Sequence, residues 1–249
     1  MSAPQTVIYL LHQADIAAHS RLARVAQGWL NDAERERQHR FKNPRAQHTY
    51  LLSRALLRGC LSGHCSRPPE QLQFAYGKAG KPYLCQTQSD IAFNLSHSGQ
   101  WLALAVSQQG AVGVDIEQPE KPRDVIKIAR HYFHRSEYRA LANLPAKAQE
   151  REFYRLWTLK EAFFKARGTG ISEGLENIRF NDGKTPIKAI ISPQLMSPEQ
   201  RWQFYYWYNP EQLQPPCHLA LTSQGANTTV PVVTRVTQND LLNSVHRTP

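Results

Sequence analysis

Apolar residues along this chain follow two periodicities, which divide it into strand-like and helix-like segments. Short apolar runs of about four to eight residues predict strands, and we expect them at residues 7–11, 91–95, 101–106, 111–117, 187–191, 202–208, 217–222 and 230–236. Apolar residues spaced by three and four predict helices, which we expect at residues 31–40, 45–61, 124–131, 136–143 and 147–167, with a short one within 238–249. The chain is therefore expected to mix helices and small sheets in each half.

Capping and breaking residues set the limits of several segments. Asn31 followed by Glu34 matches a capping box, which starts a basic helix. Gly168 stands where the long helix 147–167 would end, and the stretch 77–82 interrupts regular structure. A faint echo of residues 101–107 in residues 218–223 is weak support for an internal duplication.

Composition restricts the number of domains, the cellular compartment and the class of partner only in part. Of its 249 residues, 41% are hydrophobic and 20% are charged, which is ordinary for one large folded domain or two small ones. The net charge of +10 favours anionic partners, and nucleic acid, anionic membranes, phosphorylated small molecules and acidic proteins all satisfy it. Scattered cysteines and the lack of a leader or a membrane-spanning run lead us to expect a reduced, cytoplasmic protein.

Two acidic residues on one predicted strand are the first candidates for chemistry. Asp115 and Glu117 stand two positions apart, so both carboxylates project from the same face of that strand. Two carboxylates held together repel unless a cation lies between them, and their hard oxygen atoms suit Mg²⁺. Taken alone, the pair fits an exposed sheet face with two charges better than it fits a metal site.

The long helix 147–167 contains the second set of candidates. Trp157, Glu161 and Lys165 recur every four residues on one helix face. Glu161 is a candidate third metal ligand, and Lys165 is a candidate to reach a phosphate oxygen or a leaving group. The alternative is a surface pair of opposite charges. Because the helix is rich in apolar residues it should be packed, and charged residues on a packed helix need partners, which favours a functional role.

A polar cluster at the end of the predicted strand 91–95 is the third candidate. Ser96, His97 and Ser98 offer several hydrogen-bond donors suited to a phosphate, and a neighbouring anion raises the pKa of a histidine. A polar hairpin turn is the alternative interpretation.

A basic stretch over residues 21–58 is the fourth candidate. It contains nine arginines and lysines against three acidic residues. Arginine forks recognise phosphate with two parallel hydrogen bonds, although a solvated helix face explains most of these residues individually.

Taken together, four motifs resemble the Sfp-type 4'-phosphopantetheinyl transferases. They are Gly80-Lys-Pro82, Phe93-Asn-Leu-Ser-His-Ser98, Gly113-Val-Asp-Ile-Glu117 and Trp157-Thr-Leu-Lys-Glu-Ala-Phe-Phe-Lys165. Each motif alone is weakly specific, but the four occur in the order and spacing of that family, across roughly residues 35–171. The helix that contains Ser53-Arg-Ala-Leu-Leu-Arg58 also resembles the one that precedes these motifs in the family.

The resemblance implies a fold and an activity. The fold is α+β, with two similar α/β subdomains (residues 1–111 and 112–249) and the active site between them, in a monomer. The activity is transfer of 4'-phosphopantetheine from coenzyme A to a serine of an apo-carrier protein, with Mg²⁺ and with release of 3',5'-ADP. The implied partners are coenzyme A and an acidic apo-carrier protein, with neither nucleic acid nor membrane.

The resemblance also implies roles for particular residues. The metal ligands are Asp115, Glu117 and Glu161. The catalytic residues are Glu161 and Lys165. The residues that bind coenzyme A or its phosphates are Arg54, Lys81, Pro82, Ser96, His97, Lys160 and Lys165, and Trp157 supports the site.

This chain departs from the family where relatives often have basic residues before the Arg-Ala-Leu-Leu helix. Glu34 and Thr49 fall at two such positions. The candidates to hold the 3'-phosphate of coenzyme A instead are Arg37, Arg40, Arg45 and Arg54.

Other functions stay open on the residues alone. Net charge is compatible with nucleic-acid binding, although the motifs of such proteins are missing. The same carboxylates would serve a metal-dependent phosphatase or nuclease. A relative that only binds carrier proteins is a further alternative, against which the complete set of Asp115, Glu117, Glu161 and Lys165 argues.

Overall fold

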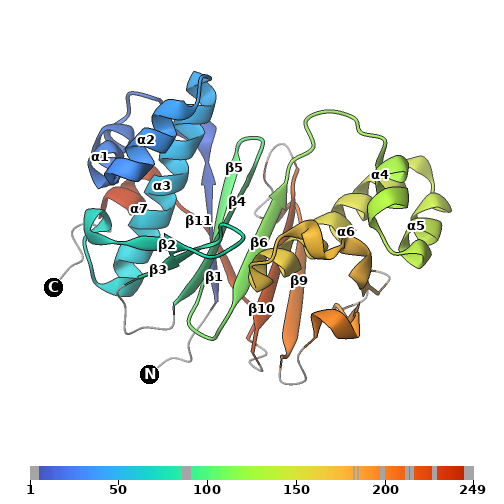
Figure 1. Ribbon diagram of the computed structural model, residues 1–249. Coiled ribbons are helices and arrows are strands. Elements are labelled where there is room, and N and C mark those ends of the chain that lie inside the picture. Colours follow the sequence, from blue (N-terminus) through green and yellow to red (C-terminus); the bar gives the residue numbers. More distant parts are fainter. Residues whose placement is uncertain are drawn as a thin grey trace.

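Two small sheets lie back to back between two groups of helices (Figure 1). The structure, a computed structural model, describes residues 6–85, 91–181, 183, 185–196, 200–210, 213, 216–225 and 229–243. One sheet has the strand order β11-β1-β5-β4, and the other has the order β6-β10-β9. The layers therefore run helix, sheet, sheet, helix, which confirms the predicted α+β class.

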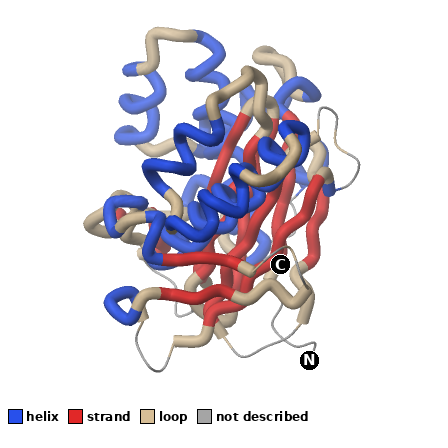
Figure 2. The backbone as a smooth tube through the Cα atoms, turned by 90° about the vertical axis from the view of Figure 1, so that its right-hand side faces the viewer, coloured by secondary structure: helices blue, strands red, loops and turns tan. Residues whose placement is uncertain are grey.

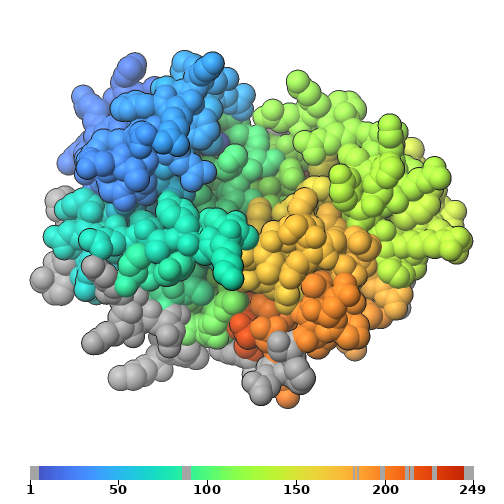
Figure 3. All heavy atoms as spheres, viewed as in Figure 1, coloured from blue at the N-terminus to red at the C-terminus, as the bar shows by residue number. Residues whose placement is uncertain are grey.

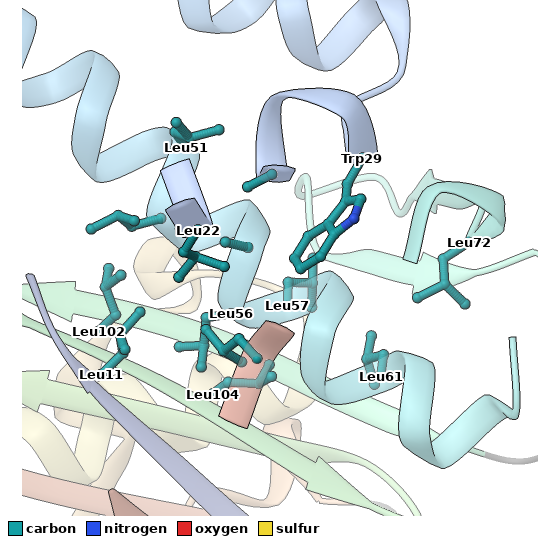
Figure 4. Packing of buried hydrophobic residues seen from close by; sticks show 14 of the residues in the cluster. Leu11, Leu22, Trp29, Leu51, Leu56, Leu57, Leu61, Leu72, Leu102 and Leu104 are labelled. Carbon is teal, nitrogen blue, oxygen red and sulfur yellow. The ribbon is translucent and has the colours of Figure 1, made fainter. Parts of the chain in front are cut away.

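The first sheet is covered on its outer face by the N-terminal helices. Its strands are β11 (Val232–Arg235), β1 (Val7–His12), β5 (Trp101–Ser107) and β4 (Ala92–Ser98). The helices are α1 (Arg21–Trp29), α2 (Asp32–Arg40), α3 (Pro44–Cys65) and α7 (Gln238–Asn243). Figure 4 shows Leu22 and Trp29 of α1 and Leu56 and Leu57 of α3 above Leu102 and Leu104 of β5. This apolar layer exists because α1 and α3 each turn an apolar stripe toward the sheet.

The second sheet is covered by a group of helices around α6. Its strands are β6 (Val112–Glu117), β10 (His218–Gln224) and β9 (Trp202–Tyr208). The helices are α4 (Val125–Tyr132), α5 (Arg135–Ala142) and α6 (Ala146–Arg167), and the short strands β7 (Ile178–Phe180) and β8 (Ala189–Ile191) form a hairpin beside them. Phe153, Phe163 and Phe164 of α6 are buried in this core together with Phe204 of β9.

The inner faces of both sheets share a third core. Ile8, Leu10 and Ala103 from the first sheet pack in one cluster with Val114 and Leu219 from the second. Strand residues alternate between two faces, so each sheet buries one face against helices and the other against its partner sheet. Figure 2 shows the strands of both sheets seen from the side.

The two segments with similar sequence occupy equivalent places. β5 lies between β1 and β4, and β10 lies between β6 and β9, so each is the antiparallel centre of three strands. Each of the two sheets also packs against a helix of 22 residues, α3 or α6. These correspondences support the prediction of two similar halves.

Several elements differ from the predicted ones, and four of the differences affect the description of the fold. Helix α1 was not predicted, although Ser20 caps it and its buried residues have helical spacing. Strand β4 continues through Ser98, where a turn was the alternative. The interrupted stretch 77–82 is the turn of a hairpin between β2 (Phe74–Tyr76) and β3 (Pro82–Leu84). Finally, β11 pairs with β1 and α7 packs on α3, so the end of the described chain returns to the first half instead of belonging to the second; residues 244–249 lie outside the described part.

Five short 3₁₀ helices complete the described chain. They are η1 (Gln13–Asp15), η2 (Pro69–Gln71), η3 (Ile171–Glu173), η4 (Leu175–Asn177) and η5 (Pro193–Leu195). None of the helices in the described residues is long and apolar enough to cross a membrane.

Candidate active site

The site begins with the close approach of α6 to β6. A Cβ atom placed on Gly113 would lie only 2.1 Å from the carbonyl oxygen of Ala162 and 2.3 Å from the amide nitrogen of Ala166. Only glycine allows the helix to come this near. The next positions on the same strand face are Asp115 and Glu117, and the neighbours of the two alanines on α6 are Glu161 and Lys165. The fold therefore brings the two sequence-predicted motifs together.

Asp115 is the centre of this cluster. Its side chain is buried, and its Oδ1 accepts a hydrogen bond from the Lys165 ammonium at 2.5 Å and from the Ser96 hydroxyl at 2.9 Å. Its Oδ2 is also buried and has no hydrogen-bond partner among the described residues. A buried carboxylate oxygen without a partner is costly, so this atom is suited to a cation.

The carboxylates of this site affect one another's protonation. Burial, and then the charge of Asp115, raise the pKa of Glu117. Burial and the same charge raise the pKa of Glu161 to about 7. Burial alone would lower the pKa of Lys165, but Asp115 and the other two carboxylates outweigh it and raise that pKa. The site therefore favours positive charge.

The polar cluster of β4 forms the seam between the two sheets. Asn94, Ser96 and Ser98 all point toward β6, where their oxygen atoms accept hydrogen bonds from the backbone N–H groups of residues 114, 116 and 118, at 2.9, 3.4 and 3.1 Å. Two of the hydroxyls also bond metal-ligand candidates: Ser96 donates to Asp115, and Ser98 donates to Glu117 at 3.0 Å. The seam thus joins the halves and orients two carboxylates at once.

The donor set fits a hard divalent cation. Three carboxylates and an unpartnered buried oxygen match the oxygen ligands that Mg²⁺ prefers. In the part of the chain that the structure describes, however, no three acidic, histidine or cysteine side chains are gathered closely enough to hold a metal as they stand. The chemistry of the residues fits, and the Lys165 ammonium is the cation that contacts Asp115 in this structure.

A groove of about 490 Å³ lies next to these carboxylates, on the side of the first half. Three of the arginines proposed for phosphate binding line it, together with Thr49, His97 and Pro82; they are Arg37, Arg45 and Arg54. Tyr50 and Tyr76 add aromatic rings to its wall. Strand β4 is common to the groove and to the carboxylate cluster. Basic and aromatic groups of this kind suit a phosphorylated nucleotide.

Comparisons with known proteins agree with this geometry. The profile of the 4'-phosphopantetheinyl transferase superfamily matches residues 111–220, and that of the 4'-phosphopantetheinyl transferase N-terminal region matches residues 19–109. The chain is 36% identical to the 4'-phosphopantetheinyl transferase HetI of Nostoc sp. over 66% of its own length and 70% of that protein. The chain belongs to the 4'-phosphopantetheinyl transferase family.

Two Bacillus relatives are similar to the chain over comparable regions. The 4'-phosphopantetheinyl transferase Sfp of Bacillus subtilis is 32% identical over 64% of this chain and 71% of that protein. The transferase psf-1 of Bacillus pumilus is 43% identical over 51% of this chain and 53% of that protein. The matches therefore span from about half to about seven tenths of these relatives. The family predicted from the four motifs is confirmed.

Lys160 has a different place from the one that the family resemblance implied. Its side chain is completely buried, and its ammonium donates to Glu137 at 2.7 Å and to the carbonyl oxygens of Leu175 and Ile178. All three of its hydrogen-bond donors are thus used within the protein. It has no exposed surface with which to contact coenzyme A, so the prediction of a cofactor-binding role for Lys160 is corrected to a structural one.

Ser96 and Lys81 also bond protein groups in place of a ligand. The Ser96 hydroxyl is buried and donates to Asp115, while it accepts from Lys165 at 3.0 Å. The Lys81 ammonium donates to the carbonyl oxygens of Val112 and Ala166. Both residues lie beside the site, yet in this structure each positions other groups of the protein.

The basic candidates for the 3'-phosphate divide into two groups. Arg37, Arg45 and Arg54 line the groove, whereas Arg40 is exposed and paired with Glu36 at 2.6 Å. Glu34 has a structural role, because its carboxylate caps α2 and accepts two hydrogen bonds from the buried Arg58. The acidic residue at a position where relatives are often basic therefore braces α2 against α3 and does not line the groove.

His97 lines the groove, and its electrostatic surroundings differ from the expectation. Partial desolvation and the nearby Lys165 lower the pKa of His97, against a smaller opposing effect of Asp115. In the ligand-free protein the imidazole is therefore neutral near pH 7, and only an added anion would favour its charged form.

Sequence reasoning missed one residue of the site and gave another a different partner. Asn94 contacts β6 and was noted only as part of a motif, and Ser98, expected to donate to a phosphate, bonds β6 and Glu117. Their signal was the polar alternation at positions 94, 96 and 98, which gives one strand face three small hydrogen-bonding side chains. Which strand that face meets depends on the pairing of two halves, and sequence spacing does not determine it.

Proposed function

We propose that this protein transfers the 4'-phosphopantetheine group of coenzyme A to a serine hydroxyl of an apo-carrier protein, with Mg²⁺, and releases 3',5'-ADP. The observation that supports this most is the groove with Arg37, Arg45 and Arg54 beside the cluster of Asp115, Glu117 and Glu161. A basic groove beside a carboxylate cluster suits a substrate with a phosphorylated nucleotide and a reactive pyrophosphate.

The groove would hold the nucleotide end of coenzyme A. Arg54 is buried beneath the ring of Tyr50, with its guanidinium carbon 5.4 Å from the ring centre, and its Nε has no hydrogen-bond partner among the described residues. Arg37 lies near the same ring at 5.8 Å. A guanidinium with an unused donor is suited to a phosphate oxygen.

The transfer forms one bond and breaks another at the same phosphorus atom. The serine oxygen bonds the β-phosphorus of coenzyme A, and the bond from that phosphorus to the oxygen of 3',5'-ADP breaks. Mg²⁺ held by Asp115, Glu117 and Glu161 would supply Lewis-acid stabilisation of the pyrophosphate. The Lys165 ammonium lies within hydrogen-bond reach of Asp115 and would neutralise charge on the leaving group.

The serine proton needs an acceptor within the site. Glu161 is the candidate that this chain offers, because it faces the cluster from α6, where burial and the charge of Asp115 raise its pKa in the metal-free protein. A water molecule in the site is the alternative acceptor. The carboxylates of Asp115 and Glu117 are held by Ser96 and Ser98, so Glu161 is the carboxylate without such a brace.

A basic surface on α4 and α5 suits an acidic carrier protein. Arg130, Arg135 and Arg139 of α4 and α5 surround a hollow of about 500 Å³ over Phe133. None of the three pairs with a carboxylate within the described ranges, in contrast to the paired arginines of α2. Uncompensated positive charge attracts acidic partners and speeds their encounter.

Intact mass spectrometry tests the proposed function. Candidate apo-carrier proteins are incubated with the protein, coenzyme A and Mg²⁺, and we expect a mass gain of one phosphopantetheine together with release of 3',5'-ADP. The Asp115→Ala variant should remain folded and lose the Mg²⁺-dependent transfer. Full activity of that variant would show that the metal assignment is wrong.

Two further measurements distinguish the alternatives. Release of inorganic phosphate without a mass gain would indicate a phosphatase. Thermal stabilisation by duplex DNA, but not by coenzyme A with Mg²⁺, would indicate a nucleic-acid-binding protein.

A further inference from the structure

The β2–β3 hairpin reaches from the first half of the molecule to the second. Its apolar base residues, Phe74 and Leu84, pack on the core of the first half. Its turn is closed by a hydrogen bond from the Gly77 N–H to the Lys81 carbonyl at 2.9 Å, and Gly80 adopts a positive φ of 80°. This turn directs the Lys81 side chain away from its own half. Figure 3 shows the teal hairpin in contact with the yellow end of α6.

The Lys81 ammonium ends between two elements of the second half. It donates to the Val112 carbonyl at 2.9 Å, at the start of β6, and to the Ala166 carbonyl at 3.0 Å, in the last turn of α6. Carbonyl groups in the last turn of a helix have no partner within the helix, and the negative end of the helix dipole favours a cation there. The aliphatic part of the side chain lies against Gly168, which ends α6.

The bonded groups belong to the two elements that supply the carboxylate cluster. Val112 stands three residues before Asp115 on β6, and Ala166 directly follows Lys165 on α6. The residues next to Lys81 in the hairpin, Gly80 and Pro82, line the groove. One side chain thus connects the wall of the groove to both elements that supply the carboxylates and Lys165.

We propose that Lys81 is a clasp: a positioning residue that fixes the groove of the first half against the α6–β6 unit of the second, and not a ligand of the substrate. Its two acceptors are backbone atoms, so the clasp depends on a long side chain with a donor at its end and on no particular partner residue. Burial lowers the pKa of Lys81 to about 8, in keeping with a group enclosed by protein. The proposal has a structural part, that Lys81 holds the two halves in a fixed relation, and a catalytic part, that this relation is needed for the transfer. Only the catalytic part rests on the proposed function.

Hydrogen exchange of the ligand-free protein tests the structural part. In Lys81→Met, peptides from the β2–β3 hairpin and from the end of α6 should exchange faster by a factor on the order of ten or more, because two hydrogen bonds to a charged donor are lost. Lys78→Met is the matched control, since Lys78 is an exposed residue of the same turn that does not line the groove. Lys81→Arg, which keeps a long cationic donor, should restore most of the protection.

Coenzyme A binding and steady-state kinetics test the catalytic part. We expect Lys81→Met to lower kcat as well as to raise the KM for coenzyme A, and Lys81→Arg to recover kcat. Unchanged exchange in the ligand-free protein together with weaker coenzyme A binding would overturn the clasp in favour of a direct ligand. Unchanged exchange and unchanged kinetics would leave Lys81 without either role. Absence of transfer in the wild type as well would count against the proposed function, while the exchange result would still decide the clasp.

Discussion

Two lysines five residues apart on α6 show how one helix serves structure on one face and chemistry on another. Lys160 is completely buried and bonds Glu137 at 2.7 Å, and Lys165 is 28% exposed and bonds Asp115 at 2.5 Å. Five residues turn about 140° around a helix axis, so the two ammonium groups face opposite environments. Both lysines form ion pairs, but the pair of Lys165 belongs to the carboxylate cluster, whereas that of Lys160 does not.

The surroundings of each pair explain the difference. Around Lys160 lie two backbone carbonyl groups and the rings of Phe133 and Phe180, so every donor is satisfied and water has no access. Around Lys165 lie three carboxylates and one buried oxygen without a partner. In the first pair every donor has a partner, so removing one charge leaves the other buried and unpaired. The second has surplus negative charge, which suits a further cation.

The largest expected effect is on stability, from Lys160→Met. This change leaves Glu137 buried without its cation, and breaking a buried pair in this way costs about 3–5 kcal/mol. Chemical denaturation should show that loss, and Lys147→Met, at an exposed position of the same helix, should show almost none. The double variant Lys160→Met/Glu137→Gln should be less unstable than the single one. Equal stability of the wild type and Lys160→Met would contradict the structural role of Lys160, on which the comparison with Lys165 depends.

Next in size is the effect of Lys165→Met on catalysis. We expect kcat to fall by about 10²-fold, the scale of losing one electrostatic stabiliser, while the melting temperature changes far less than in Lys160→Met. Steady-state kinetics with a carrier protein, alongside a thermal melt, measures both. If only the affinity for coenzyme A changed, Lys165 would be a binding residue.

A smaller effect should appear at acid pH and concerns the sheet face that packs against α6. His218 is buried among tyrosine rings, and burial, followed by the charge of Arg151, lowers its pKa to about 4. Because this folded pKa lies below the unfolded value, the unfolded chain binds the proton more readily. The stability that His218 contributes is therefore present above about pH 6.5 and is lost as the pH falls toward 4.

The size of that loss follows from the two pKa values. Between pH 7 and pH 5 it amounts to ~2 kcal/mol. Denaturation midpoints measured across this range should fall less steeply for His218→Phe than for the wild type. Parallel curves for the two proteins would show that the imidazole is not the group responsible.

The smallest effect should come from the exposed arginines. Reversing the charge of Arg130, Arg135 and Arg139 together should raise the KM for an acidic carrier protein about three- to tenfold at low ionic strength, with little change in the KM for coenzyme A. Added salt should slow the wild type and reduce this difference. The matched control is charge reversal at three exposed arginines of the first half, namely Arg21, Arg24 and Arg67. A kcat/KM that is independent of salt would contradict the role of this surface.

Most regular elements and the main site residues could be predicted from local patterns. The capping box of Asn31 and Glu34 forms as predicted, because both partners lie within one turn. Asp115 and Glu117 share a strand face, and Glu161 and Lys165 share a helix face, because these periods are properties of the backbone. The missed helix α1 and the misassigned end of the chain have different causes: the first had an overlooked cap at Ser20, and the second depends on pairing with β1, over 200 residues away in sequence.

The sequence alone determined the family, the α+β class and the candidate carboxylates, because motif order and periodicity are local features of the chain. Only the tertiary structure showed which groups Lys81, Ser96 and Lys160 bond, whereas their motifs made all three equal candidates to bind coenzyme A. Each is polar and each stands in a matching motif, but their hydrogen bonds go to Ala166, Asp115 and Glu137, respectively. A polar side chain bonds whichever acceptor the fold brings within about 3 Å. Here the packing of α6 against β6, α5 and the β2–β3 hairpin determines that acceptor.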